Sequence, residues 1–180
     1  MAFFMHVAFP MRLLLFSLLL LACLPQVAFA AGIGDVAPDW SLKSPAGEPL
    51  QFYADSKDQV SVVLFWATWC PFCRKLMPHI QTVADEFKGQ PVRFYALNVW
   101  EDADPVAYLK EHGFAFSMLL AAEPAAAAYG VKGTPGLFVV DKTHTIRYLR
   151  ESGEDDLDVE IALRETINAA LAETRRKSVP

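Results

Sequence analysis

The chain has 180 residues and a formal net charge of −5 at pH 7. This length suits a single domain with a hydrophobic core of its own. The acidic balance excludes nucleic-acid binding through a broad basic face as the main function. Three cysteines are too few for a small domain that is held together by disulfide bonds.

Residues 1–30 have the pattern of a signal peptide. Arg12 precedes an apolar run over residues 13–24, Pro25 ends the run, and Ala28-Phe29-Ala30 supplies the small residues of a cleavage site. The run is shorter than the roughly 20 residues of a membrane-spanning helix. We therefore expect export to the periplasm or another extracytoplasmic compartment, with cleavage after Ala30 and one domain over residues 31–180.

Two other interpretations of the leader stay open. It can remain uncleaved as an N-terminal anchor, which would be the protein's one contact with a membrane. Alternatively, Leu20-Leu21-Ala22-Cys23 is a lipoprotein cleavage site that leaves a lipidated Cys23.

Cleavage after Ala30 would leave only Cys70 and Cys73. Because two cysteines three residues apart cannot hold a fold together, they indicate chemistry.

The first half of the domain predicts two strands and a long helix. Residues 34–40 are extended, residues 44–47 form a turn and residues 50–52 a short strand. Residues 60–65 are nearly all apolar and β-branched, which is typical of a strand buried on both faces. A helix is expected from Pro71 to Gly89. Its apolar stripe faces the core at four positions: Leu76, Ile80, Val83 and Phe87.

The second half continues the alternation of strands and helices. Strands are predicted over residues 92–99, 116–120, 137–140 and 145–149, the last two joined as a hairpin. Asp104-Pro105 begins a short helix that Gly113 ends, and a second helix covers residues 123–129. A final helix from Asp155 is expected to bury one apolar stripe: Leu157, Ile161, Leu163, Ile167, Ala170 and Leu171. This order predicts a three-layer α/β fold.

The two cysteines sit where a strand gives way to a helix, in Trp69-Cys70-Pro71-Phe72-Cys73. With Pro71 as the first helical residue, Cys70 is the N-cap and Cys73 lies one turn further on, so the sulfurs can form a disulfide. The free N–H groups and the partial positive charge of the helix start favour a thiolate at Cys70. We expect Cys70 to be exposed and Cys73 to be shielded.

An inert cysteine pair or half of a metal site are the alternatives to redox chemistry. A zinc site would need two further ligands. The three histidines of the domain, His79, His112 and His144, are not spaced like metal ligands. No metal and no cofactor is expected.

The stretch from Phe65 to Lys75 resembles the active site of thioredoxin-like proteins, in particular the TlpA/ResA group of exported disulfide reductases. The opening Gly34-Asp35-Val36-Ala37-Pro38-Asp39-Trp40-Ser41-Leu42 and Pro78, five residues after Cys73, match as well. The resemblance covers roughly residues 34–172. It implies a thioredoxin-like fold with a central mixed sheet, an N-terminal extension and an extra helix–strand insert between Asn98 and Pro135.

The resemblance also implies roles for particular residues. Cys70 and Cys73 would be the catalytic pair, and the Thr134–Pro135 bond would be cis and face them. The residues implied for the substrate groove are Trp69, Pro71, Phe72, Thr134 and Pro135. A client segment would pair with the backbone of Thr134 in the manner of an added strand.

Some residues depart from the pattern of the group. Leu64 stands where thioredoxin has a buried aspartate, and Leu76 stands where ResA-type proteins have a glutamate. The proton of Cys73 must therefore be exchanged with water or with an acid that the sequence does not identify. Phe72 replaces the usual proline, and Gly136-Leu137 replaces the common Thr-Thr.

The function implied is reduction of protein disulfides, for example in cytochrome c maturation. Its partners would be protein disulfide substrates and a membrane thiol reductase that donates electrons. Two alternatives stay open: the same chemistry run as a dithiol oxidase or isomerase, and a copper-handling protein that uses both thiols as ligands.

Overall fold

The computed structural model describes residues 30–177, with side chains described as far as residue 173. The predictions about the leader, including the N-terminal anchor and lipidation at Cys23, fall on residues 1–29 and lie outside this range. Within the described part of the chain, no helix is long and apolar enough to cross a membrane.

A five-stranded mixed sheet forms the centre of the fold. Its strands are β3 (Val60–Trp66), β4 (Val92–Asn98), β5 (Ser117–Leu119), β6 (Gly136–Val140) and β7 (Ile146–Leu149). They are arranged in the order β5-β4-β3-β6-β7. β4 runs parallel to β3 and β5, whereas β6 is antiparallel to β3 and β7. This confirms the predicted mixed sheet and the closing hairpin.

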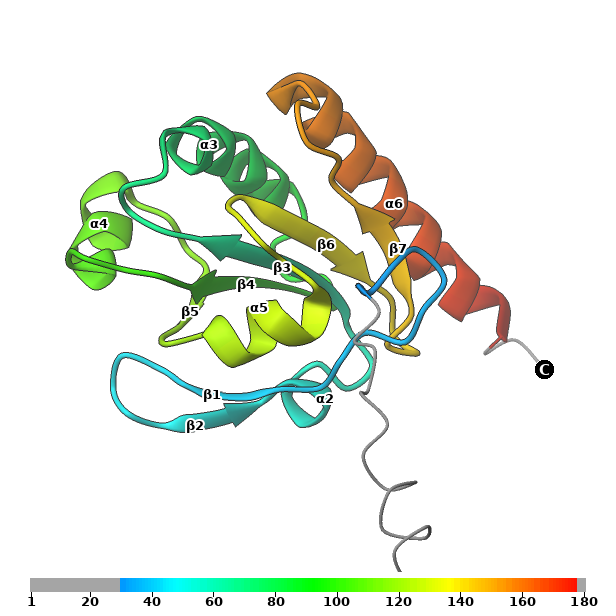
Figure 1. The fold of residues 1–180 in the computed structure, drawn as a ribbon. Helices are drawn as coiled ribbons and strands as arrows, with labels where there is room; N and C mark the ends of the chain where they lie inside the picture. Colours follow the sequence, from blue (N-terminus) through cyan, green and yellow to red (C-terminus); the bar gives the residue numbers. More distant parts are fainter. Residues whose placement is uncertain (1–29, 178–180) are drawn as a thin grey trace, which may run out of the picture.

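Helices cover both faces of the sheet, as Figure 1 shows. One face carries α3 (Pro71–Glu86), α4 (Pro105–His112) and α6 (Asp156–Lys177). The other carries α5 (Glu123–Tyr129), α2 (Phe52–Asp55) and the hairpin of β1 (Ser41–Lys43) and β2 (Pro49–Gln51). Alternate residues of β3 enter the two cores, because side chains along a strand point to opposite faces. The three-layer prediction is confirmed.

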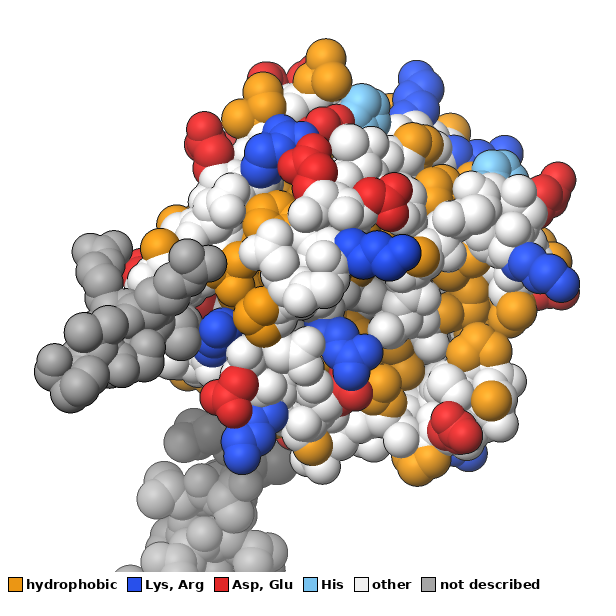
Figure 2. Space-filling model, turned by 180° about the vertical axis from the view of Figure 1, so that it is seen from behind, with side chains coloured by type: hydrophobic (Ala, Val, Ile, Leu, Met, Phe, Trp, Pro, Cys, Tyr) orange, Lys and Arg blue, Asp and Glu red, His pale blue; other side chains and the backbone are white. Residues whose placement is uncertain are grey.

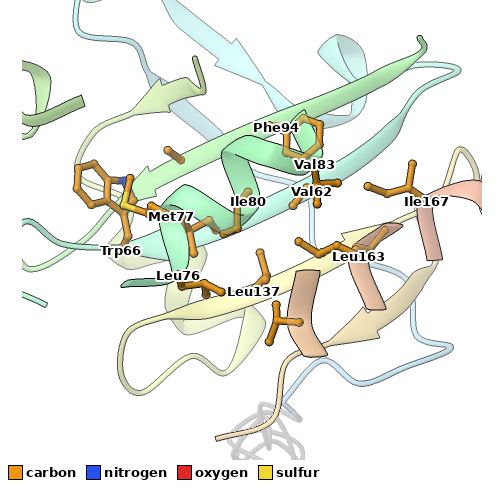
Figure 3. Packing of buried hydrophobic residues seen from close by; sticks show 14 of the residues in the cluster. Val62, Trp66, Leu76, Met77, Ile80, Val83, Phe94, Leu137, Leu163 and Ile167 are labelled. Carbon is orange, nitrogen blue, oxygen red and sulfur yellow. The ribbon is translucent and has the colours of Figure 1, made fainter. Parts of the chain in front are cut away.

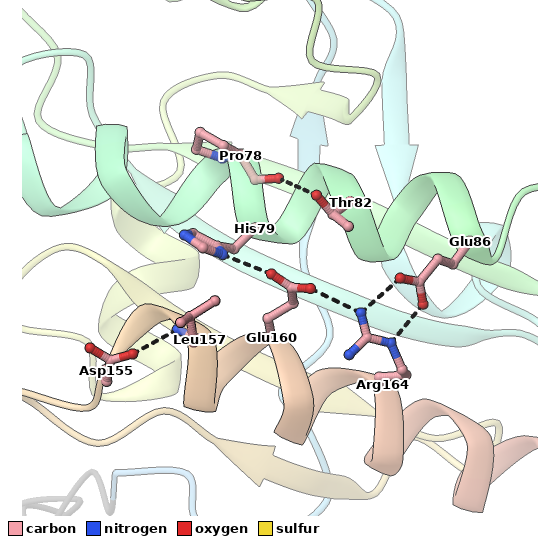
Figure 4. A network of polar contacts seen from close by, with 8 residues as sticks. All are labelled: Pro78, His79, Thr82, Glu86, Asp155, Leu157, Glu160 and Arg164. Atoms are coloured by element: carbon pink, nitrogen blue, oxygen red, sulfur yellow. Dashed lines mark hydrogen bonds and ion pairs between the residues drawn. The ribbon is translucent and has the colours of Figure 1, made fainter.

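The core beneath α3 and α6 fixes the helix that begins at the cysteines. Leu76, Ile80 and Val83 of α3 pack with Leu163 and Ile167 of α6 over the sheet (Figure 3). Polar contacts cross the outer side of the same helix pair (Figure 4). Glu160 lies 2.7 Å from Nδ1 of His79 and 2.9 Å from Arg164, and Arg164 also contacts Glu86 at 2.7 Å. α3 is therefore held along its whole length.

The predicted stripe of α6 is wrong at two positions. Leu157 is 60% and Ile161 50% exposed, whereas Val159, which was not predicted, is fully buried. The buried stripe consists of Val159, Leu163, Ile167, Ala170 and Leu171. Leu157 and Ile161 each lie two positions before a member of this stripe, which places them on nearly the opposite side of a helix with 3.6 residues per turn.

The N-terminal part of the domain also differs from prediction. Phe52 begins α2 and does not end a strand, because its ring is fully buried and stacks on Trp40 at 4.9 Å between ring centroids. The extended segment before it continues into β1, which pairs with β2. Residues 34–37 also pair with β7 and the turn before it, as Gly34 N–H donates to the carbonyl of Ile146 at 2.8 Å. The extension thus becomes part of the second core.

The insert between β4 and β6 comprises α4, β5 and α5. Asp104 caps α4 by accepting from Val106 and Ala107, and Gly113 ends it in the left-handed conformation, as predicted.

On the face of the molecule seen in Figure 2, acidic and basic side chains are interspersed.

Candidate active site

The cysteines lie at the carboxyl end of the central strand. β3 ends at Trp66, residues 67–69 turn, and α3 begins at Pro71 with Cys70 as its N-cap. The N–H of Cys73 donates to Sγ of Cys70 at 3.2 Å. A first-turn N–H that points at a sulfur favours negative charge there. The local geometry therefore follows the prediction made from the Cys-Pro-Phe-Cys spacing.

The loop at residues 133–136 covers Cys70. The Thr134–Pro135 bond is cis, as the resemblance implied. The carbonyl of Thr134 accepts a hydrogen bond from Sγ of Cys70 at 3.5 Å. As a result Cys70 is only 2% exposed and Cys73 is fully buried. The expectation that Cys70 is exposed is wrong, because the sequence around it gives no sign of a loop 64 residues away.

A groove of about 820 Å³ opens beside this loop. Phe72, Thr134 and Pro135 line it, together with the cations Lys75, Lys132 and Arg150 and, at the start of α6, Asp155 and Asp156. Three of the five residues predicted for a substrate groove are thus brought together. Trp69 and Pro71 are exposed close by but are not among the described residues that line it.

The surroundings of Cys73 hold it in the thiol form. Burial raises the pKa of Cys73 most strongly, and the neighbouring Cys70 raises it further. The backbone of Ala67 and the hydroxyl of Thr134 act in the opposite direction but do not outweigh burial. Leu64 and Leu76 are both buried, so the two positions discussed above present methyl groups and no carboxylate.

This raised pKa predicts that the dithiol protein loses stability in alkali. Above about pH 8.5 the unfolded chain releases the Cys73 proton while the folded chain keeps it, so unfolding becomes easier as the pH rises. Cys73→Ser lacks this contribution. Between pH 8 and 9.5 the free energy of unfolding of the wild type should fall by about 1–2 kcal/mol relative to Cys73→Ser. Urea unfolding under reducing conditions measures it, and a constant difference between the proteins would contradict the prediction.

Glu101 was not singled out by the sequence but holds the turn before Cys70. Its carboxylate accepts from the N–H and the hydroxyl of Thr68 at 2.9 and 2.6 Å, and from the side-chain amide of Asn98 at 2.7 Å. Burial alone would raise the pKa of Glu101, but these hydrogen bonds bring it below the ordinary value. Because β3 and β4 are parallel, their carboxyl ends meet at one edge, which is the signal that could have identified Glu101.

Two further side chains extend this support toward α4. Nε of Arg74 donates to the carbonyl of Thr68 at 2.7 Å, and its guanidinium lies 5.9 Å from the ring centroid of Tyr108. Tyr108 in turn packs against Trp66, with the ring centroids 5.6 Å apart. The insert helix is thereby connected to the end of β3 and, through Arg74, to the turn that precedes Cys70.

No group of three or more potential metal ligands occurs among residues 30–177. Two of the three histidines form polar contacts with other side chains: His79 contacts Glu160, and Nε2 of His144 lies 3.2 Å from the hydroxyl of Ser56.

Three features on this five-stranded sheet together define a thioredoxin-like protein. One cysteine lies at the start of a helix, a second cysteine follows one turn later, and a loop with a cis-proline covers the first cysteine. Solved structures agree on the fold. A thiol:disulfide interchange protein from Chlorobium tepidum TLS superposes with a TM-score of 0.65 at 24% identity, covering 79% of this chain and 99% of that one.

Sequence comparison identifies the family. The AhpC/TSA family matches residues 33–149, and the chain belongs to it. The thiol:disulfide interchange protein DsbE of Escherichia coli K12 is 34% identical over 131 residues, 69% of this chain and 68% of that protein. The thiol-disulfide oxidoreductase ResA of Geobacillus thermodenitrificans is 29% identical over 140 residues, 72% of this chain and 80% of that one. The chain is a thiol-disulfide oxidoreductase of the thioredoxin-like type.

Proposed function

We propose that the protein is an exported disulfide reductase that acts on protein disulfides through Cys70 and Cys73. The single observation that carries the proposal is the hydrogen bond from Cys73 N–H to Sγ of Cys70 at the start of α3. It places a stabilised sulfur nucleophile within one helical turn of a second thiol. The pattern of residues 1–30 supports export.

Reduction proceeds in two exchanges. The Cys70 thiolate attacks one sulfur of the client disulfide, forms a mixed disulfide and releases the other client sulfur as a thiolate. Cys73 then loses its proton and attacks Sγ of Cys70, which forms the Cys70–Cys73 disulfide and releases the second client thiolate. Leu64 and Leu76 carry no carboxylate that could accept the proton of Cys73. The client thiolate released in the first exchange accepts it, or a water molecule that enters with the client does.

The resemblance to the TlpA/ResA group of exported disulfide reductases favours the reducing direction. The raised pKa of Cys73 keeps its sulfur protonated until the second exchange. A two-electron donor must then restore the dithiol, and a membrane thiol reductase fits an exported protein. The resemblance to the TlpA/ResA group favours clients in cytochrome c maturation.

The redox potential tests the direction. We expect a value nearer to the −270 mV of thioredoxin than to the −120 mV of the oxidant DsbA, both approximate. Equilibration of the purified protein with dithiothreitol buffers of known ratio, followed by thiol alkylation, measures it. A potential above about −150 mV would favour the oxidase alternative.

A further inference from the structure

Three aromatic side chains near the start of α3 are exposed, and two of them lie outside the groove. Trp69 is 46%, Phe72 64% and Trp100 40% exposed. Of these, only Phe72 belongs to the described lining of the groove. The indole N–H of Trp69 donates to the carbonyl of Trp100 at 2.7 Å. The two tryptophans are thus joined, although 31 residues separate them in the sequence.

The backbone of Trp100 is in a conformation that bulky residues rarely adopt. Its φ is +50°, in the left-handed region where glycine or asparagine is common. Hydrogen bonds hold it there: its N–H donates to the carboxylate of Glu123 at 2.7 Å, and its carbonyl accepts from Trp69. Burial does not compensate for the strain, since much of the ring remains exposed. Strained residues of this kind cluster at functional sites.

The position of Trp69 limits what can contact this pair. A disulfide bond between Cys70 and a client brings the two Cα atoms within about 4.4–6.8 Å. Each further residue of an extended client chain adds about 3.3–3.6 Å. The residues on either side of the client cysteine therefore lie within reach of Trp69, whose indole binds the backbone carbonyl of Trp100. Exposed tryptophans at interfaces bind apolar and aromatic groups well.

We propose that Trp100, together with Trp69, is a specificity-determining residue that contacts the client segment next to its reacting cysteine and selects aromatic or apolar side chains there. This rests on the proposed function, because it requires Cys70 to attack a protein disulfide. The groove with its lysines and aspartates would take another part of the same client.

Two symmetric peptide disulfides test the proposal, identical except that Phe or Ser flanks the cysteine on both sides. The wild type should reduce the Phe peptide with a kcat/KM about tenfold above that of the Ser peptide. Trp100→Gly suits the left-handed backbone and keeps the carbonyl that binds Trp69, and it should lose most of this preference. Trp100→Phe should retain part of it. Ile161→Asn, which changes an exposed apolar residue on α6, should keep the wild-type preference.

Several outcomes would overturn the proposal. If Trp100→Gly kept the wild-type preference for the Phe peptide, Trp100 would not determine specificity. If kcat/KM fell equally for both peptides and the thermal midpoint fell as well, the role of Trp100 would be purely structural. A change of oligomeric state in Trp100→Gly, measured by sedimentation, would show that a second copy of the chain covers the pair. If the wild type reduced neither peptide, the proposed function itself would fail, and this inference with it.

Discussion

Cys73→Ser is expected to accumulate mixed disulfides with client proteins, whereas Cys70→Ser should accumulate few and lose turnover by about 10³-fold or more. The reason lies in the environments of the two sulfurs. Sγ of Cys70 receives the N–H of Cys73 at the helix start, and burial raises the pKa of the Cys73 thiol. Cys70 is therefore the nucleophile that attacks the client disulfide. Without the Cys73 sulfur, the mixed disulfide forms but cannot be resolved.

The trapping is measured by expressing each variant in the exported compartment, blocking free thiols with acid and an alkylating agent, and comparing non-reducing gels. Cys23→Ser in the same backgrounds is the control, because it removes the third cysteine of the chain. Equal trapping by both variants would contradict the assigned roles. Full disulfide-reducing activity in both would contradict the redox proposal altogether.

Glu101→Ala is expected to lower the free energy of unfolding by about 3 kcal/mol and turnover by about 10- to 100-fold. The substitution leaves the N–H and hydroxyl of Thr68 and the amide of Asn98 without their acceptor, and Thr68 and Asn98 are both buried. Thr68 lies two residues before Cys70 and also accepts from Arg74. A loosened turn therefore displaces Cys70 from Thr134 and from the N–H of Cys73.

Glu101→Gln should be nearly as damaging, because both carboxylate oxygens accept from donors and an amide NH₂ would face one of them. Since the pKa of Glu101 is below its ordinary value, its contribution to stability is present above about pH 4.3 and is lost as the pH falls through the lower folded value. Denaturant unfolding and turnover of a peptide disulfide measure the two effects. Glu111→Ala, an exposed glutamate on α4, is the control, and wild-type values in Glu101→Ala would contradict the prediction.

Local signals in the sequence determined most elements and the start of the candidate site. Some features depend only on neighbours a few residues away. They are the strands buried on both faces, the start of α4 at Asp104-Pro105 and the glycines that end α4 and α5. The same holds for α3, since Pro71 after Cys70 sets the N-cap and the spacing to Cys73. The resemblance then supplied the Thr134–Pro135 loop, which no local rule would have placed opposite the cysteines.

The tertiary structure decided what depends on residues far apart in the sequence. Cys70 is buried because the carbonyl of Thr134 lies against it, and Glu101 matters because parallel β3 and β4 end side by side. The buried side of α6 was misjudged because apolar residues occupy both sides of that helix and only packing against α3 selects one. The carbonyl of Trp100 likewise accepts the indole N–H of Trp69 only in the folded chain. Sequence periodicity reports local conformation, whereas burial, pKa and hydrogen-bond partners arise from contacts between distant segments.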